Sequence, residues 1–153
     1  KILAEGAGIY GMIGGQVVDV ASCGVGLDEG MLNFIYELKT GALIESSMMI
    51  GALLAGAEDA ELEKVQKIAS DVGIAFQIQD DILDVTSTTE ELGKPVHSDE
   101  KNEKTTYVTL KGLEKATRDV EVISQEALEL LSGLDRENAY LTQLIRELIH
   151  RKK

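Results

Sequence analysis

Apolar residues recur at helical spacing in the last third of the chain. Intervals of three and four residues alternate along Leu113, Ala116, Val120, Ile123, Ala127, Leu130 and Leu134. This alternation is typical of a helix that packs along a narrow seam against another helix. A final amphipathic helix is predicted over residues 141–149, with apolar positions at Leu141, Leu144, Ile145, Leu148 and Ile149. The basic residues 150–153 suit the negative end of that helix, and we assign them no catalytic role.

The first third of the chain predicts two further helices. Residues 1–23 are mostly apolar or glycine, with only three charged side chains, which predicts a helix buried on most of its surface. Its glycines permit close packing or a bend. A Gly-Val-Gly segment then ends the helix, and Asp28 is the expected N-cap of the next one, whose apolar stripe is Met31, Phe34, Ile35 and Leu38. Gly41 permits a kink where this second helix enters the apolar residues 42–55.

A long third helix is predicted over residues 60–85, and its second half sets acids among apolar side chains. At about 3.6 residues per turn, Gln77, Asp80, Asp81 and Asp84 lie within roughly one third of the circumference. Neighbouring carboxylates repel one another, so a positive partner is expected. Side-chain oxygens without nearby His or Cys suit a hard ion such as Mg²⁺, which bridges to phosphates. A solvated acidic face is the alternative, but the apolar flanks favour a cavity lined by the core.

The lone proline, Pro95, marks a change from helix to loop. Residues 93–106 carry both signs of charge and little apolar content, which predicts a flexible loop directly after the acidic helix. Lys94 and Lys104 could reach an anion held by a metal on the aspartates, and Asp99 could orient one of them. Solvated loop lysines are the ordinary alternative.

Composition supports a single all-α domain. The 153 residues are 44% hydrophobic and 4% aromatic with one Pro, which favours helices over a sheet. The net charge of -12 argues against a nucleic-acid partner. The longest apolar run, residues 48–57, is much shorter than the ~18 residues of a membrane span, so we predict no membrane span and a cytoplasmic location. Cys23 is the lone cysteine, which predicts a reducing compartment and a buried thiol.

Four ordered motifs together resemble the C-terminal half of a trans-type polyprenyl diphosphate synthase of the farnesyl and geranylgeranyl kind. They are Gly14-Gly15-Gln16 with Asp19, Lys39-Thr40-Gly41, Phe76-Gln77 with Asp80-Asp81-Ile82-Leu83-Asp84, and Gly93-Lys94 with Asp99 and Lys104. The four motifs extend over nearly the whole chain and are more specific together than any one alone. The resemblance implies a helical bundle of the isoprenoid synthase type. Residues 1–153 would be the C-terminal part of a single domain, with the N-terminal half absent.

The resemblance also implies roles for individual residues. The Mg²⁺ ligands would be Asp80, Asp81 and Asp84, with Asp80 and Asp84 nearest the ion. The residues expected to bind substrate are Gln16, Asp19, Lys39, Thr40, Gln77, Lys94, Asp99 and Lys104. Direct catalytic roles are expected for Lys39, Thr40, Gln77 and Asp80. The implied substrates are isopentenyl diphosphate and an allylic prenyl diphosphate, and the implied assembly is a homodimer.

Two parts of the family pattern are missing from these residues: the first aspartate-rich motif and the basic residues that hold isopentenyl diphosphate. We therefore expect the 153 residues alone not to catalyse elongation. One alternative is a related all-α protein that binds diphosphates without elongating them, such as a non-catalytic partner subunit or a terpene cyclase. Another is a helical scaffold whose acids are merely solvated.

Overall fold

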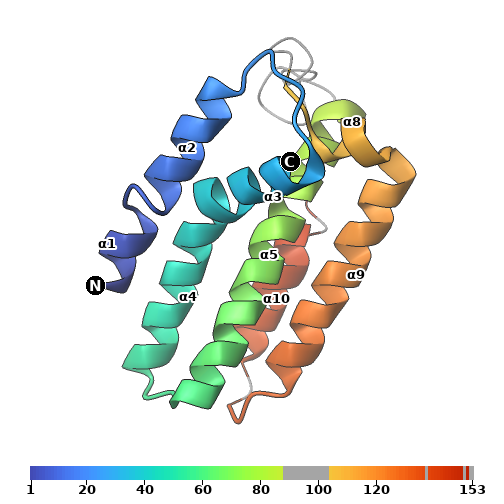
Figure 1. Ribbon diagram of the computed structural model, residues 1–153. Helices are drawn as coiled ribbons and strands as arrows, with labels where there is room; N and C mark the ends of the chain where they lie inside the picture. The colour runs from blue at the N-terminus through green and yellow to red at the C-terminus, as the bar shows by residue number, and fades with distance from the viewer. Residues whose placement is uncertain (88–103, 137, 150, 152–153) are drawn as a thin grey trace.

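The structure, a computed structural model, describes residues 1–87, 104–136, 138–149 and 151, and every regular element in these ranges is helical (Figure 1). The elements are α1 (Ile2–Gly6), α2 (Met12–Ala21), α3 (Glu29–Tyr36), η1 (Glu37–Gly41), α4 (Ala42–Leu54), α5 (Asp59–Thr86), α8 (Tyr107–Lys111), α9 (Leu113–Ser132) and α10 (Ala139–Ile149). Segment η1 is a π-helix, and the others are α-helices. The predicted all-α fold is therefore confirmed.

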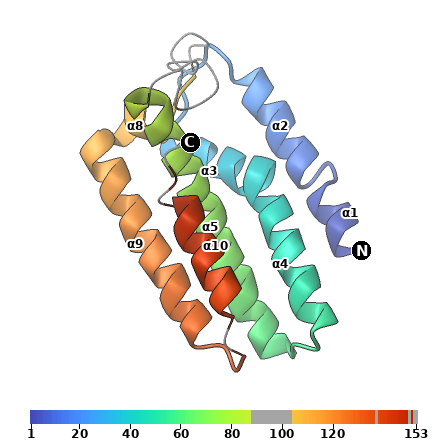
Figure 2. The same cartoon turned by 180° about the vertical axis from the view of Figure 1, so that it is seen from behind.

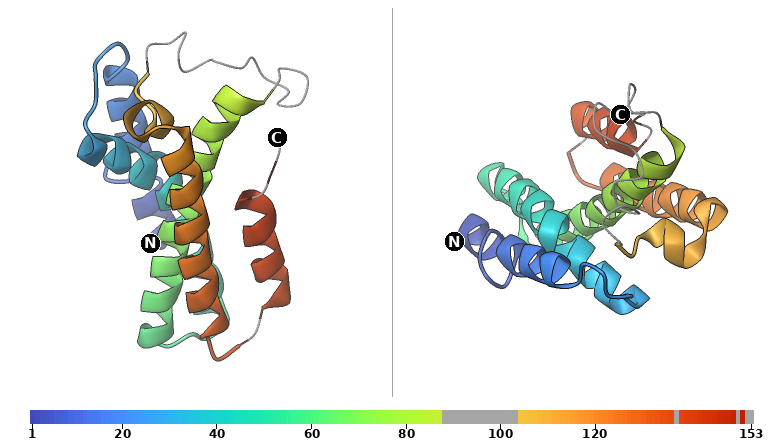
Figure 3. Two further views of the ribbon diagram at one scale, coloured as in Figure 1. Left: turned by 90° about the vertical axis from the view of Figure 1, so that its right-hand side faces the viewer. Right: turned by 90° about the horizontal axis from the view of Figure 1, so that it is seen from above.

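Helix α5 is the centre of the bundle. Helices α4, α5 and α9 run side by side, with α1 and α2 beyond α4 (Figure 1). Helix α10 packs against α5 and α9 on the face turned away from the viewer in Figure 1. In Figure 2, which shows the molecule from behind, α10 lies in front of α5. Helices α3 and α8 lie at the end of the bundle where α5 finishes (Figure 3). This arrangement brings the last turns of α5 close to η1 and to the beginning of α8.

The core forms where α5 meets α9 and α10. Its buried members on α5 are Ile68, Val72, Ile78 and Ile82, and they belong to one cluster with Ala116, Val120, Ala127 and Leu131 of α9 and with Ile145 and Ile149 of α10. The predicted seam on α9 is confirmed in its central part, where Ala116, Val120 and Ala127 are buried. Leu113 is exposed because it lies in the first turn of the helix.

The π-helix η1 explains the main error in the predicted packing of residues 29–38. Asp28 caps α3 as predicted, since its side chain accepts the Met31 N–H at 2.8 Å. The predicted stripe is right at Ile35, which is buried, but is otherwise displaced by one residue: Leu32 and Tyr36 are buried, whereas Met31 and Phe34 are exposed. One extra residue in a helical turn produces this displacement, so the kink expected at Gly41 is instead a π-helical segment.

Two glycines allow η1 to approach both neighbouring helices closely. A methyl group on Gly15 of α2 would collide with the backbone nitrogen of Lys39, and one on Gly73 of α5 would lie 2.9 Å from the Gly41 Cα. Any larger side chain at either position would push η1 away. The π-helix is therefore held between α2 and α5 by backbone contact.

The N-terminal flank differs from its prediction. Residues 1–23 form two helices, because a turn separates α1 from α2. Large apolar side chains on this flank are exposed, namely Leu3, Ile9, Tyr10, Ile13, Val17 and Val20. Cys23, predicted to be buried, is also exposed, since the turn after α2 brings it to the surface. Across the described ranges, no helix combines the length and the apolar character that crossing a membrane requires.

Candidate functional site

A small cavity lies where α2, η1, α5 and the segment before α8 meet. Its volume is about 110 Å³, and its lining includes six of the predicted site residues: Asp19, Lys39, Gln77, Asp80, Asp81 and Lys104. Larger cavities of about 630 and 510 Å³ exist elsewhere, but neither is lined by a predicted site residue. The fold thus brings together residues that are up to 85 positions apart in the chain.

One wall of the cavity is a carboxylate held between two lysines. The Lys39 ammonium lies 2.5 Å from Asp19 Oδ2, and the Lys104 ammonium lies 2.9 and 3.0 Å from the two Asp19 oxygens. Burial alone would raise the pKa of Asp19, but the hydrogen bonds and charges of the two lysines lower it below its usual value. Asp19 therefore stays ionised and holds two ammonium groups at one point.

The π-helix determines where Lys39 lies. Lys39 and Thr40 both belong to η1, and the close approach of Gly15 brings the Lys39 backbone against α2, which carries Asp19. Extra residues of this kind inside helices are frequent at functional sites. The sequence reveals the Lys-Thr-Gly motif but not its π-helical conformation.

The opposite wall is the buried carboxylate of Asp81. Its Oδ2 accepts a hydrogen bond from the Tyr36 hydroxyl and a second from the Tyr107 N–H at 2.6 Å. The Tyr107 N–H also lies 3.2 Å from the Tyr36 hydroxyl oxygen. Asp81 is only 8% exposed, so these bonds form away from bulk water. Asp81 consequently connects α5 to the end of α3 and to the start of α8.

Asp80 lies beside Asp81 but has a different environment. Its Oδ1 accepts a hydrogen bond from the Arg151 guanidinium at 3.0 Å, and the Asp80 side chain is 39% exposed. The same guanidinium stacks 3.9 Å from the centroid of the Phe76 ring. Arg151 was not predicted at the site, because the basic residues 150–153 were assigned no catalytic role. An arginine in a short basic tail carries no signal of a partner 71 positions away.

Three of the predicted site residues that the structure describes, Gln16, Thr40 and Asp84, do not line the cavity. Asp84 is buried at 3% exposure, Gln16 is exposed on α2, and Thr40 is partly buried next to Lys39. Lys94 and Asp99 lie outside the described residues. The structure therefore brings six of the predicted residues to one cavity.

The carboxylates fit Mg²⁺ only as an ion shared with a ligand. Within the described ranges, no three His, Cys, Asp or Glu side chains are arranged to hold a metal by themselves. Mg²⁺ is commonly bound through one or two carboxylates, with waters and substrate phosphates as its other ligands. Asp80 and Asp81 line the same cavity as Lys39 and Lys104. This donor set suits a Mg²⁺ ion that is completed by phosphate oxygens.

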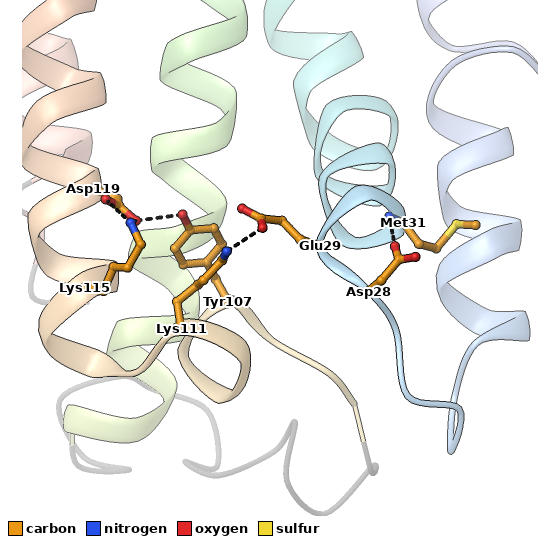
Figure 4. Close-up of polar contacts among 7 residues, drawn as sticks. All are labelled: Asp28, Glu29, Met31, Tyr107, Lys111, Lys115 and Asp119. Carbon is orange, nitrogen blue, oxygen red and sulfur yellow. Dashed lines mark hydrogen bonds and ion pairs between the residues drawn. The ribbon is translucent and has the colours of Figure 1, made fainter.

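Helix α8 is fixed on the side away from the cavity (Figure 4). The Tyr107 hydroxyl donates to Asp119 at 2.7 Å, Lys115 pairs with the same carboxylate, and Lys111 pairs with Glu29 of α3. Burial and the nearby Asp119 carboxylate raise the pKa of Tyr107 above its usual range. A capping box between Thr106 and Thr109 begins the helix. Helix α8 is therefore anchored to α9 through its first residue, Tyr107, and to α3 through its last residue, Lys111.

Comparisons with known proteins agree with this arrangement. A family model described as "Polyprenyl synthetase" matches residues 5–147. The chain is 43% identical over 138 residues to the chloroplastic geranylgeranyl pyrophosphate synthase of Capsicum annuum, covering 90% of this chain and 37% of that protein. It is 43% identical over 136 residues to the chloroplastic heterodimeric geranylgeranyl pyrophosphate synthase large subunit 1 of Arabidopsis thaliana, covering 87% and 37%. The chain thus spans under two fifths of the length of these relatives.

A solved structure supports the same relationship. The geranyltransferase of Helicobacter pylori, complexed with magnesium and isoprenyl diphosphate, superposes with a TM-score of 0.80 at 35% sequence identity. The match covers 97% of this chain and 48% of that one. The helical arrangement described above is therefore found within a longer helical protein.

Proposed function

This chain belongs to the polyprenyl synthetase family, and from that premise we propose that the protein condenses isopentenyl diphosphate with an allylic prenyl diphosphate. The observation that carries the proposal is the meeting of two lysines and two carboxylates at one cavity. Ammonium groups bind a diphosphate, and carboxylates bind the metal that accompanies it. The same cavity is the proposed site of substrate ionisation.

The proposed reaction has three changes of bonding. The C–O bond between the allylic carbon and its diphosphate breaks, a carbon–carbon bond forms to isopentenyl diphosphate, and a proton is released. Negative charge develops on the leaving diphosphate, so Lys39 and Lys104 would stabilise it by hydrogen bonds and charge. Before the ligand binds, Asp19 holds both ammonium groups at the cavity wall.

Other residues at the site have roles that depend on their chemistry. Gln77 lines the cavity, and Thr40 follows Lys39 on η1, so we propose that their side-chain oxygens lie near the developing carbocation. The apolar side chains of Leu27, Leu32 and Ile35 line the same cavity and would limit the entry of water, which quenches a carbocation. Gln16, Lys94 and Asp99 stay predicted substrate contacts.

Mg²⁺ is the proposed cofactor, and when bound it would neutralise charge on the leaving diphosphate. We propose Asp80, Asp81 and Asp84 as the residues that hold it. Asp80 has the strongest support, because it lines the cavity and is the most exposed of the three carboxylates. The Helicobacter pylori relative, which was solved with magnesium and isoprenyl diphosphate, supports this cofactor and this class of ligand.

We further propose that residues 1–153 are the C-terminal part of one synthase domain and that the protein forms a homodimer. The share of the relatives that the chain spans supports the first proposal. The exposed apolar side chains of α1 and α2 support a further packing surface. The Arabidopsis relative is named as a heterodimer subunit, so light scattering of the full-length protein alone tests the homodimer.

Since several relatives are named chloroplastic, the predicted cytoplasmic location needs imaging of the tagged full-length protein.

A product assay tests the proposed function. The full-length protein is incubated with isopentenyl diphosphate and allylic diphosphates of increasing length, with Mg²⁺ or with EDTA, and the products are sized. We expect prenyl diphosphates longer than the acceptor that form only with Mg²⁺. Binding of inorganic diphosphate without condensation of any acceptor would contradict elongation and favour a non-catalytic partner subunit or a cyclase.

A further inference from the structure

We propose that Tyr36 is a positioning residue of this site, whose hydroxyl holds the carboxylate of Asp81 and fixes both lysines relative to the acids of α5. This inference rests on the proposed function, because it concerns how that site binds diphosphate. Neither the aspartate motif nor the Lys-Thr-Gly motif includes Tyr36. Its role follows from three hydrogen-bonding groups that meet at one buried point.

Tyr36 connects η1 to α5. It is the last residue of α3, directly precedes η1, and is 5% exposed. Its hydroxyl donates to Asp81 Oδ2. Lys39 follows Tyr36 by three residues, within the same continuous helical stretch. The hydroxyl therefore links the backbone that carries Lys39 to the helix that carries the candidate metal ligands.

The same point also locates Lys104. The Tyr107 N–H lies 2.6 Å from the Asp81 oxygen that Tyr36 binds and 3.2 Å from the Tyr36 hydroxyl. Lys104 precedes Tyr107 by three residues and its ammonium contacts Asp19 at the cavity wall. Because α8 is anchored on its other side through Asp119, this contact determines where residues 104–106 cross the cavity wall. Tyr36 thus lies between the two lysines and acts on both.

The hydroxyl group, rather than the ring, carries this role. The ring contributes to the apolar core, and phenylalanine preserves that contribution. Because Asp81 is buried, water cannot readily replace the Tyr36 hydroxyl as its hydrogen-bond donor. A hydrogen bond to a charged carboxylate is also stronger than one between neutral groups. Removing the hydroxyl should therefore loosen Asp81 and the start of α8 while the core stays packed.

The test uses Tyr36→Phe in the full-length protein, with Tyr140→Phe as the matched control. Tyr140 lies on α10 and is 76% exposed, so its substitution removes a hydroxyl from the surface. The first readout is hydrogen exchange at the Tyr107 amide, which needs neither metal nor substrate. We expect exchange about 10- to 100-fold faster in Tyr36→Phe, the size expected for one hydrogen bond to a charged group, and unchanged in Tyr140→Phe. Unchanged exchange in Tyr36→Phe overturns the inference.

The second readout is binding of inorganic diphosphate in the presence of Mn²⁺, measured by calorimetry. We expect Tyr36→Phe to weaken binding about tenfold, and to have little further effect in the Asp81→Asn background, because the hydroxyl acts through Asp81. An equal loss in both backgrounds overturns the inference. If the wild-type protein binds no diphosphate while the Tyr107 amide responds as expected, the proposed function fails but the positioning of Asp81 by Tyr36 stands.

Discussion

The two walls of the cavity each centre on one carboxylate, but they bind it in different ways. Asp19 is held by two charged lysines whose side chains are 32% and 26% exposed. Asp81 is held by a tyrosine hydroxyl and a backbone amide, both from buried residues. The lysines that hold Asp19 are charged and partly open to solvent, whereas the Tyr36 and Tyr107 donors described for Asp81 are neutral and lie in the core.

This difference indicates a division of tasks. Water and a diphosphate can replace Asp19 as partners of partly exposed ammonium groups at little cost. Breaking the bonds that neutral donors make to a buried carboxylate is costly, because water does not readily replace them. The Asp19 wall is therefore suited to exchange partners with a ligand, and the Asp81 wall is suited to keep the elements in place.

Asp80 lines the same cavity as Asp19 and Asp81, and its loss should have the largest effect. We expect Asp80→Ala to reduce turnover by about 10² to 10³, corresponding to roughly 2.7 to 4 kcal/mol, if it removes one well-oriented electrostatic stabiliser. Steady-state kinetics of the full-length protein measures this. Glu126→Ala, which removes an exposed acid from α9, is the control and should keep full activity. Turnover of Asp80→Ala within a factor of two of the control would contradict a role at the metal.

Asp81 should have the next largest effect, and on stability rather than on turnover alone. Asp81→Ala leaves the buried Tyr107 N–H without its carboxylate, which costs about 1 to 3 kcal/mol in the free energy of unfolding. The helix periodicity alone suggests that losing any of the three acids leaves folding intact, since it relieves repulsion. Urea unfolding measures the stability of Asp81→Ala, and Asp19→Ala, unfolded at the same neutral pH, is the variant with which it is compared. A lower urea midpoint for Asp19→Ala than for Asp81→Ala would contradict the division of tasks.

Asp19 should give a smaller effect that depends on pH. Its pKa is lowered in the folded protein, so its ionised form stabilises the fold above the ordinary pKa of 3.8. That contribution disappears as the pH falls through the lower pKa of the folded state. Asp19→Asn should therefore be less stable than wild type at pH 7, and the difference should be smaller at about pH 3, below the ordinary pKa of 3.8. A stability difference that is the same at both pH values in urea unfolding would contradict the assigned lysine contacts.

The smallest expected effect concerns Arg151. Its guanidinium binds Asp80, so Mn²⁺ or Mg²⁺ at Asp80 must compete with it. Arg151→Gln should increase the affinity for Mn²⁺ by about threefold, the size expected for a partly exposed ion pair. Electron paramagnetic resonance of free Mn²⁺ measures the affinity. Arg146→Gln, which removes an exposed cation from α10, should leave it unchanged. A loss of affinity in Arg151→Gln would contradict the competition.

Much of the fold could be predicted because helical periodicity and capping are local properties. Asp28 caps α3 as predicted, and the predicted helix over residues 60–85 corresponds to α5 at residues 59–86. Six of the residues that line the cavity could also be found locally, since each belongs to one of the sequence motifs. Tyr36 and Arg151 were missed because their partners are 45 and 71 positions away. Only the packing of α3, α8 and the end of the chain against α5 brings those groups together.

The π-helical segment changes the helical register within the continuous helical stretch from residue 29 to residue 54. One additional residue in a helix turns everything before it by about 100° relative to everything after it. Deleting a single residue between 37 and 41 would preserve a continuous helix. If Ala42 and the rest of α4 kept their packing, however, the deletion would rotate Tyr36 away from Asp81. A one-residue deletion in η1 is therefore a more severe change to the cavity than most substitutions of single side chains around it.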